Sequence, residues 1–148
     1  MKQALIIEAS PRKEDSMSGK VARRFEEKLR REHPEARIVR RNLAEPPMPH
    51  LSDAAVHALG AGKTFAYSEK GPVGLAAGKK AVVIVASGGV YGSGPMASFD
   101  FVTPYLQRVL NFIGIQDVQL VRVEGTAVPP LAAAALPNAQ KAVEALVI

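Results

Sequence analysis

The sequence contains no cysteine. Disulfide bonds, thiolate nucleophiles and cysteine-ligated metals are therefore excluded. Its three histidines, His33, His50 and His57, share no metal-ligand spacing, and two of them adjoin prolines. We expect all three at turn or surface positions, and we predict no metal site.

The chain also lacks a long apolar run. The segment after Met1-Lys2-Gln3 is too short for a signal-peptide core or a membrane span, which predicts a cytoplasmic protein with no membrane partner. No Gly-x-Ser-x-Gly element is present, so a serine hydrolase is not favoured. The letters "LGAGKTF" at 59–65 resemble a nucleoside-triphosphate loop, but that pattern requires a glycine where His57 stands.

Aromatic residues make up only 5% of the chain, and they do not alternate with the basic residues. The net charge is +5, and twelve of the nineteen Lys and Arg lie in residues 1–41 with glutamates interleaved among them. This distribution is typical of a solvated helix face with i,i+4 ion pairs. A nucleic-acid surface, the alternative for a basic protein, would need aromatic side chains for base stacking and would bind in a strongly salt-dependent way.

The residues that are present suit one α/β domain. The 148 residues are 47% apolar and 22% charged, as in ordinary soluble globular proteins. A chain of this length can bury about 70% of its unfolded surface. We therefore predict a single domain over residues 1–148, without an internal repeat or a linker.

Apolar periodicity predicts strands that alternate with helices. Val21, Phe25 and Leu29 repeat at four-residue intervals, which indicates one face of an amphipathic helix. The run "AVVIVAS" at 81–87 is typical of a fully buried parallel strand. In chain order, the predicted elements are a strand at 3–8, a helix at 18–32, a strand at 36–41, a short helix at 54–59, a strand at 81–87, a helix at 99–113, a strand at 118–125 and a last helix from Pro137-Asn138, with an irregular segment at 43–50 and a turn-rich segment at 63–75.

Alternating strands and helices predict a parallel sheet with helices on both faces. In such sheets, ligands bind beyond the carboxyl ends of the strands. Two loops lie at such ends, one at 10–18 and one at 86–92. We expect the functional site there.

The loop at 10–18 carries serines around the start of a helix. A helix N-terminus presents unpaired N–H groups and the positive end of the helix dipole, both of which suit a phosphate. Ser10, Ser16 and Ser18 add hydroxyl donors. The simpler interpretation is that Ser16 or Ser18 only caps the helix.

The loop at 86–92 begins with Ala86, Ser87, Gly88 and Gly89. Glycine has no side chain, so the backbone of this loop can approach a flat ligand closely. An ordinary turn is an equally good interpretation of the same residues. The two loops together, at neighbouring strand ends, favour a ligand site more than either loop does alone.

Three segments between Gly71 and Ala127 closely resemble the FMN-dependent NADH azoreductases and NAD(P)H quinone reductases of the flavodoxin-like fold: "GPVGLAAGKKAVVIVASGG", "DFVTPYLQRVLNFIGIQDV" and "VEGTA". Residues 1–50 fit the same family. The resemblance implies a homodimeric flavoenzyme. In that family, FMN accepts electrons from NADH or NADPH and passes two electrons to a quinone or an azo compound, while the protein orients the flavin.

The resemblance also implies roles for particular residues. Ser10 and the run Ser16-Met17-Ser18 match the phosphate-binding loop of the family, and Ala86-Ser87-Gly88-Gly89 match the loop along the isoalloxazine edge. Ala86 stands where a serine is frequent, and Ser87 stands where an arginine can occur. Three aromatic residues resemble those that line the substrate pocket at the dimer interface of the family, although plain packing is an equally good interpretation: Phe65, Tyr67 and Phe112.

The chain departs from the family in one place. The family has a further central strand, a Met-Tyr-Asn-Phe-like loop under the flavin ring and a long helix, and a segment with these features is missing near Leu59-Gly60. The implied fold is therefore a flavodoxin-like doubly wound parallel sheet, shortened by about one strand-helix unit. Without the central strand, the strand at 3–8 either pairs directly with the strand at 81–87 or leaves backbone groups unpaired.

The predicted function is that of an FMN-dependent oxidoreductase that passes two electrons from NAD(P)H to quinones or azo compounds, with no catalytic side chain assigned. The alternative is a catalytically silent, shortened family member that acts as a binding or structural subunit. The absent loop under the ring distinguishes the two, because a phosphate loop without a ring pocket predicts weak FMN binding and no turnover.

Overall fold

The computed structural model describes residues 3–45 and 62–148. The predicted helix at 54–59, His50, His57, the Leu59-Gly60 junction and most of the irregular segment at 43–50 lie outside the described residues. The elements, in chain order, are β1 (Gln3–Glu8), the 3₁₀ helix η1 (Lys13–Asp15), α1 (Met17–Glu32), β2 (Arg37–Asn42), β3 (Phe65–Ser68), β4 (Gly71–Gly74), β5 (Lys80–Ala86), the 3₁₀ helix η2 (Gly94–Phe99), α3 (Val102–Phe112), β6 (Asp117–Val123) and α4 (Pro129–Glu144).

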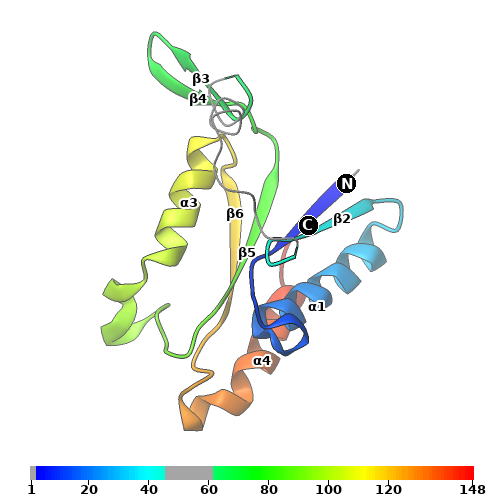
Figure 1. The fold of residues 1–148 in the computed structure, drawn as a ribbon, viewed down its shortest axis with the longest axis vertical. Coiled ribbons are helices and arrows are strands. Elements are labelled where there is room, and N and C mark those ends of the chain that lie inside the picture. The colour runs from blue at the N-terminus through cyan, green and yellow to red at the C-terminus, as the bar shows by residue number, and fades with distance from the viewer. Residues whose placement is uncertain (1–2, 46–61) are drawn as a thin grey trace.

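The strands form three two-stranded sheets (Figure 1). β1 pairs in parallel with β2, from Gln3 opposite Arg37 to Glu8 opposite Asn42. β5 pairs in parallel with β6, from Lys80 opposite Asp117 to Ala86 opposite Val123. The predicted parallel pairing is thus confirmed within each pair, but the expected continuous sheet is not formed among the described residues.

The break in the sheet lies between β1 and β5, which are not hydrogen-bonded to each other. Each of these strands therefore pairs along one edge only in the described part of the chain. On β1, Leu5 and Ile7 are each 58% exposed. On β5, side chains 81–85 are half-buried, so the prediction of a fully buried strand was wrong. A parallel strand is buried only when neighbours cover both its faces and both its edges.

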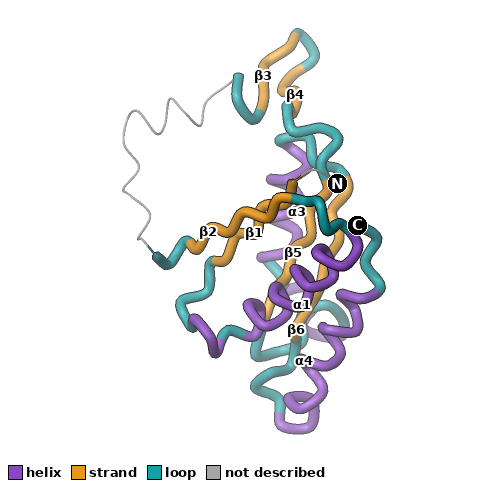
Figure 2. The backbone as a smooth tube through the Cα atoms, turned by 90° about the vertical axis from the view of Figure 1, so that its right-hand side faces the viewer, coloured by secondary structure: helices purple, strands orange, loops and turns teal. Residues whose placement is uncertain are grey.

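The hydrophobic core lies between the β5–β6 pair and the helices α1 and α4. Val121 and Val123 of β6 pack against Ala139 and Val143 of α4, and Val21 of α1 completes the cluster. Figures 1 and 2 show α1 and α4 side by side on this face, while α3 lies on the other face of the pair. Helices on both faces were predicted, and this arrangement is confirmed for β5–β6.

Helix α1 begins at Met17, after Ser16, whose hydroxyl accepts a hydrogen bond from the Gly19 N–H at 3.0 Å. It ends at Glu32, before His33-Pro34, because a residue preceding proline disfavours the helical conformation. Ion pairs at i,i+3 or i,i+4 join its charged residues, as the charge pattern predicted: Arg24–Glu27, Arg30–Glu26 and Lys28–Glu32. Glu26 and Lys28 are buried, however, so the prediction of a fully solvated face was wrong for these two residues.

The segment at 63–75, predicted to be only turn-rich, contains the antiparallel hairpin β3–β4. Ser68 pairs with Gly71 across a two-residue turn, and Gly71 has the positive φ of 109° that glycine adopts without strain. A Cβ atom on Gly74 would overlap backbone atoms of Ile113 and Gly114. Glycine at 74 therefore allows the hairpin to lie directly against the end of α3.

Helix α4 begins at Pro129, eight residues before the predicted start at Pro137, so that prediction was wrong. Proline is common at the first position of a helix, where its missing N–H is not needed, and Pro129 and Pro130 occupy that first turn. Alanines 132–135 then favour continued helix, and Pro137 is accommodated inside it. No described helix combines the length and the hydropathy that a membrane span requires.

Candidate functional site

The two strand-end loops lie at the same end of the molecule. β1 and β5 both run toward the lower end of Figure 1, and the loops at 10–18 and 86–92 follow them there. The N-termini of α1 and α4 lie at that end as well (Figure 1). The topology therefore places the two predicted parts of the site on one edge.

In the first loop, the predicted serines surround the start of α1. Ser16 is buried and acts as the N-cap, and its hydroxyl lies 3.1 Å from the hydroxyl of Ser18. Ser10 accepts a hydrogen bond from the Arg12 N–H at 3.3 Å. The cap interpretation of Ser16 is confirmed, while Ser18 is half-buried at the mouth of the loop. Since Gly19 and Lys20 donate their N–H groups to Ser16, the amides of Met17 and Ser18 are those that a phosphate could accept from.

Two further features shape this loop. The side chain of Met17 packs on the hydrophobic core, which leaves only its backbone available to a ligand. Lys13 is the only non-glycine residue with a positive φ, at 47°, in the described part of the chain. Its ammonium lies 2.7 Å from a Glu45 carboxylate oxygen, and the hydrogen bond to Glu45 raises the pKa of Lys13.

In the second loop, the glycines approach other parts of the protein. A Cβ atom on Gly88 would lie 3.2 Å from the Ala127 Cβ, and one on Gly89 would lie 3.1 Å from the ring of Tyr91. The Ser87 hydroxyl donates to the Gly89 carbonyl at 3.0 Å, and the Ser87 N–H donates to Val123. The loop is therefore held tightly against the end of β6, while Ala86, the last residue of β5, and Gly88 are exposed.

A cavity of about 320 Å³ opens beside this loop, between it and the segment 96–102. Ala86, Ser87 and Tyr91 line one side of it. Met96, Phe99 and Val102 contribute apolar side chains on the other. Its volume is at the lower end of the range for small-molecule sites.

Charged residues that the sequence did not single out join the two sides of this cavity. The guanidinium of Arg122 donates to Asp100, Thr103 and Glu124. Hydrogen bonds from Thr103 and from Arg122 hold the pKa of Asp100 far below its usual range. Burial alone would lower the pKa of Arg122, but the hydrogen bond to Asp100 raises it. The sequence signal that could have identified Arg122 was its charge, which stands between the apolar Val121 and Val123 of a strand.

The three predicted aromatic residues do come together. The ring centroid of Phe65 lies 5.5 Å from that of Tyr67, edge to face, and 5.0 Å from that of Phe112. This cluster sits where the β3–β4 hairpin meets the end of α3, at the upper end of Figure 1. The aromatic cluster is therefore at the opposite end of the same chain from the two loops, and Tyr67 is 76% exposed.

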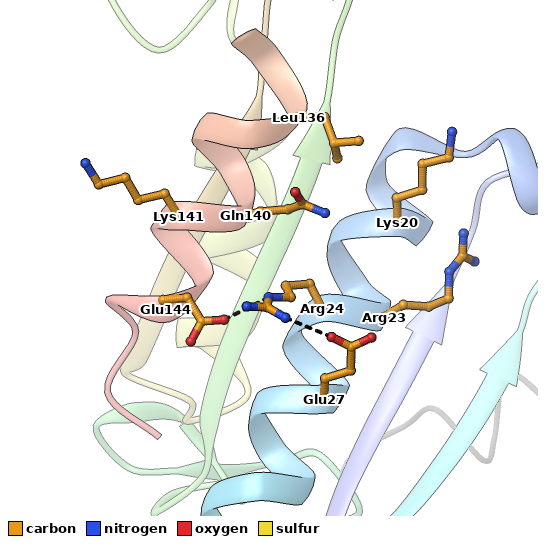
Figure 3. Close-up of a pocket in the computed structure, with 8 residues that line it drawn as sticks. All are labelled: Lys20, Arg23, Arg24, Glu27, Leu136, Gln140, Lys141 and Glu144. Atoms are coloured by element: carbon orange, nitrogen blue, oxygen red, sulfur yellow. Dashed lines mark hydrogen bonds and ion pairs between the residues drawn. The ribbon is translucent and has the colours of Figure 1, made fainter. Parts of the chain in front are cut away.

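A larger cavity, of about 510 Å³, lies between α1 and α4 (Figure 3). Arg24 crosses it, bonded to Glu27 at 3.1 Å and to Glu144 at 2.9 Å, while Lys20 and Lys141 extend outward. Ion pairs thus line this polar groove, as expected for the charged side of α1. No group of His, Asp and Glu suited to a metal ion occurs in residues 3–45 and 62–148.

Comparison with known proteins identifies relatives along the whole chain. A family described as "Flavodoxin-like fold" matches residues 2–61 and 57–147. An FMN-dependent NADH:quinone oxidoreductase of Beijerinckia indica subsp. indica is 35% identical over 202 residues, covering 100% of both chains. One of Hydrogenovibrio crunogenus is 55% identical over 71 residues, 48% of this chain and 35% of that one. A solved FMN-dependent NADH-azoreductase from Bacillus anthracis str. Ames Ancestor, in complex with FMN, has the same fold, with a TM-score of 0.81, 24% identity and 100% of both chains covered.

The same comparisons locate the missing segment. The Beijerinckia alignment spans 202 positions and this chain has 148 residues, so about 54 positions have no counterpart here. The two matches to the family meet at 57–61, which agrees with the junction predicted near Leu59-Gly60. The chain belongs to the flavodoxin-like family that includes the FMN-dependent NADH:quinone oxidoreductases, from which it departs by this internal gap.

Proposed function

We propose that this protein is an FMN-dependent oxidoreductase that passes two electrons from NADH or NADPH to a quinone or an azo compound. The observation that carries the proposal is the placement of a serine-rich helix N-terminus and a cavity beside a glycine loop on one edge of the fold. This arrangement offers an anion site next to a site for a flat, largely apolar group.

The residues of the two loops fit the two ends of FMN. The amides of Met17 and Ser18 and the hydroxyls of Ser10 and Ser18 supply neutral donors at the positive end of α1, which suits a phosphate dianion. The cavity lined by Ala86 and Ser87 suits one edge of the isoalloxazine ring. When bound there, FMN supplies the two-electron chemistry between the nicotinamide and the acceptor.

Other residues of the chain hold the backbone groups and the cavity wall that would contact FMN. Ser16 fixes the first turn of α1, so the neighbouring amides keep their direction. The bonds of Ser87 to Gly89 and Val123 fix the backbone beside the cavity. Met96, Phe99 and Val102 provide an apolar wall against which the ring can pack.

A homodimer is part of the proposal. The aromatic cluster of Phe65, Tyr67 and Phe112 is remote from the loops of its own chain, so a second copy is needed to bring such a cluster to the cavity. The exposure of Tyr67 and of Tyr105 on α3 supports this, because large exposed apolar patches often mark protein interfaces. The cytoplasmic location remains a prediction from the sequence.

The test is quinone reduction by NADH with and without added FMN, alongside FMN binding measured by quenching of flavin fluorescence. The Ser18→Ala variant should bind FMN about tenfold more weakly, because one hydrogen bond to a charged group is lost. Ser68→Ala, at the hairpin turn, is the matched control and should bind normally. Absence of saturable FMN binding by the unchanged protein would refute the proposal and favour a silent family member.

A further inference from the structure

Arg122 lies on the face of β6 that is turned away from the hydrophobic core. Its neighbours Val121 and Val123 point into the core against α4. Side chains alternate across a strand, so Arg122 points to the opposite face, where α3 packs. Its side chain is 23% exposed. A cation this deeply placed needs acceptors, and the structure supplies them from two separate segments.

The first segment is the start of α3. Nη2 of Arg122 donates to Asp100 Oδ2 at 2.5 Å and to Thr103 Oγ1 at 2.8 Å. Asp100 also accepts the N–H groups of Val102 and Thr103, at 3.2 and 3.0 Å, through its other oxygen. Asp100 therefore caps α3 with one oxygen and binds Arg122 with the other.

The second segment is the glycine loop. Nη1 of Arg122 donates to Glu124 Oε1 at 3.1 Å. That oxygen accepts the backbone N–H groups of Tyr91 and Gly92 as well, at 2.9 and 2.8 Å. A Cβ atom on Gly92 would lie 2.9 Å from both Arg122 Cδ and Glu124 Oε2, so the loop backbone rests directly on these side chains.

We propose that Arg122 is a positioning residue that fixes the glycine loop against the start of α3 and so sets the width of the cavity for the flavin ring. The inference rests on the proposed function in that it assigns the ring to this cavity. The contacts themselves do not depend on it. Arg122 lines the cavity, and its two carboxylate partners hold the opposite walls.

Charge explains why the cation is needed. Asp100 and Glu124 both bind Arg122, so without the guanidinium two carboxylates would lie near each other beside the cavity without a counter-charge. Their repulsion would drive the two walls apart. Arginine can bind both at once because its donors form a planar fork, whereas the ammonium of lysine is a single point charge.

The experiment compares Arg122→Met and Arg122→Lys with the unchanged protein. Amide hydrogen exchange without flavin is measured at Tyr91 and Gly92. Dissociation constants are measured for FMN and for riboflavin, which lacks the phosphate. In Arg122→Met we expect exchange at Tyr91 and Gly92 to accelerate at least tenfold, and both flavins to bind at least tenfold more weakly. Arg122→Lys should recover part of both effects.

Lys28→Met is the matched control, since Lys28 is a nearly buried cation that links α1 to the end of α4. It should lower stability without changing exchange at Tyr91 and Gly92 or the flavin dissociation constants. The triple variant Arg122→Met, Asp100→Asn, Glu124→Gln should bind flavin more tightly than Arg122→Met, because the repulsion is removed.

Unchanged exchange at Tyr91 and Gly92 in Arg122→Met would overturn the inference, as would equal losses in the Lys28→Met control. A third outcome would separate the positioning role of Arg122 from the proposed function: exchange accelerates in Arg122→Met as expected, but the unchanged protein binds neither FMN nor riboflavin. The proposed function would then fail, together with the assignment of the ring to this cavity, while the positioning of the loop by Arg122 would stand.

Discussion

Glu26 is a carboxylate that the fold buries on α1 between two arginines. It accepts hydrogen bonds from Arg30 Nη2 at 2.6 Å and from Arg40 Nε at 2.7 Å. Burial alone would raise the pKa of Glu26, but the hydrogen bonds from Arg30 and Arg40 outweigh burial and lower it. Because the lowered pKa belongs to the folded state, Glu26 stabilises the protein above its unfolded pKa of about 4.3, and this contribution is lost as the pH falls through the folded value.

The corresponding prediction concerns acid stability. The Glu26→Gln variant should lose less free energy of unfolding than the unchanged protein between about pH 5 and pH 3, because glutamine has no proton to take up. Urea unfolding at several pH values measures this difference. Parallel stability curves for the two proteins would contradict the assigned pKa direction. Glu27→Gln, on the exposed side of α1, is the control and should leave the slope nearly unchanged.

Lys28 is 3% exposed, and its ammonium donates to the carbonyls of Glu144 and Leu146 at 2.6 and 2.7 Å. A cation at a helix C-terminus satisfies carbonyls that have no helical partner. Lys28→Met should lower the free energy of unfolding by about 2 kcal/mol, as expected for lost hydrogen bonds to a charged group. Denaturant unfolding gives the value. The variant Lys141→Met, at an exposed position of α4, should change the free energy of unfolding little. Equal losses in both variants would argue that the contact of Lys28 with the end of α4 does not stabilise the fold.

At the level of single residues, the sequence predicted the serines of the first loop because helix caps follow local chemistry. Ser16 needs only the next three residues to act. Arg122 was not predicted, because its partner Asp100 is 22 positions away and meets it only when β6 and α3 pack. The roles of Ser18 and Ala86 toward FMN remain predictions.

Among the elements, α4 carries a proline where a helix normally excludes it. Pro137 removes one backbone donor from the helix interior and crowds the carbonyl of the preceding turn. Pro137→Ala should therefore raise the free energy of unfolding by about 1 to 3 kcal/mol, reduced by the greater freedom of alanine in the unfolded chain. Pro129→Ala, at the first helical position, is the control and should give no gain. Thermal unfolding compares them, and a destabilised Pro137→Ala would show that the proline is required there.

The same proline explains one error in the sequence-based fold. Proline commonly opens a helix, so Pro137 suggested a start that the preceding alanines overrode. The hairpin β3–β4 was missed because its strands are short and contain Gly74 and Pro72, which are unfavourable in strands. The location of β5 was predicted correctly because a continuous apolar run of strand length has few other interpretations. β6 was located because it is rich in valine, which favours strands, although polar residues interrupt it.

For the whole molecule, the main feature is that β1 and β5 do not pair with each other, so each leaves one edge open among residues 3–45 and 62–148. Unpaired backbone groups favour any strand that can pair with them. The alignment with the Beijerinckia relative is about 54 positions longer than this chain, and the two matches to the family meet at residues 57–61. Inserting the relative's additional segment between Leu59 and Gly60 should raise the unfolding temperature and tighten FMN binding at least tenfold, because a restored strand would pair with both edges.

A glycine-serine linker of equal length, inserted at the same position, is the control for chain length. It should not stabilise the protein, because a flexible loop stays disordered in both the folded and the unfolded protein and supplies no strand to pair with β1 or β5. Thermal unfolding and FMN titration are measured for both insertions. If the two insertions behave the same, the open edges do not limit the stability of the fold.

The most direct test of the account is the visible absorbance spectrum of the purified chain after incubation with excess FMN and desalting, followed by addition of NADH. We expect a flavin band in equimolar amount that NADH bleaches and a quinone restores. That result would mean that the two loops build the site across the gap in the sheet. A colourless protein would contradict the account, since family membership would then describe the chain's ancestry and the loops alone would not hold the cofactor.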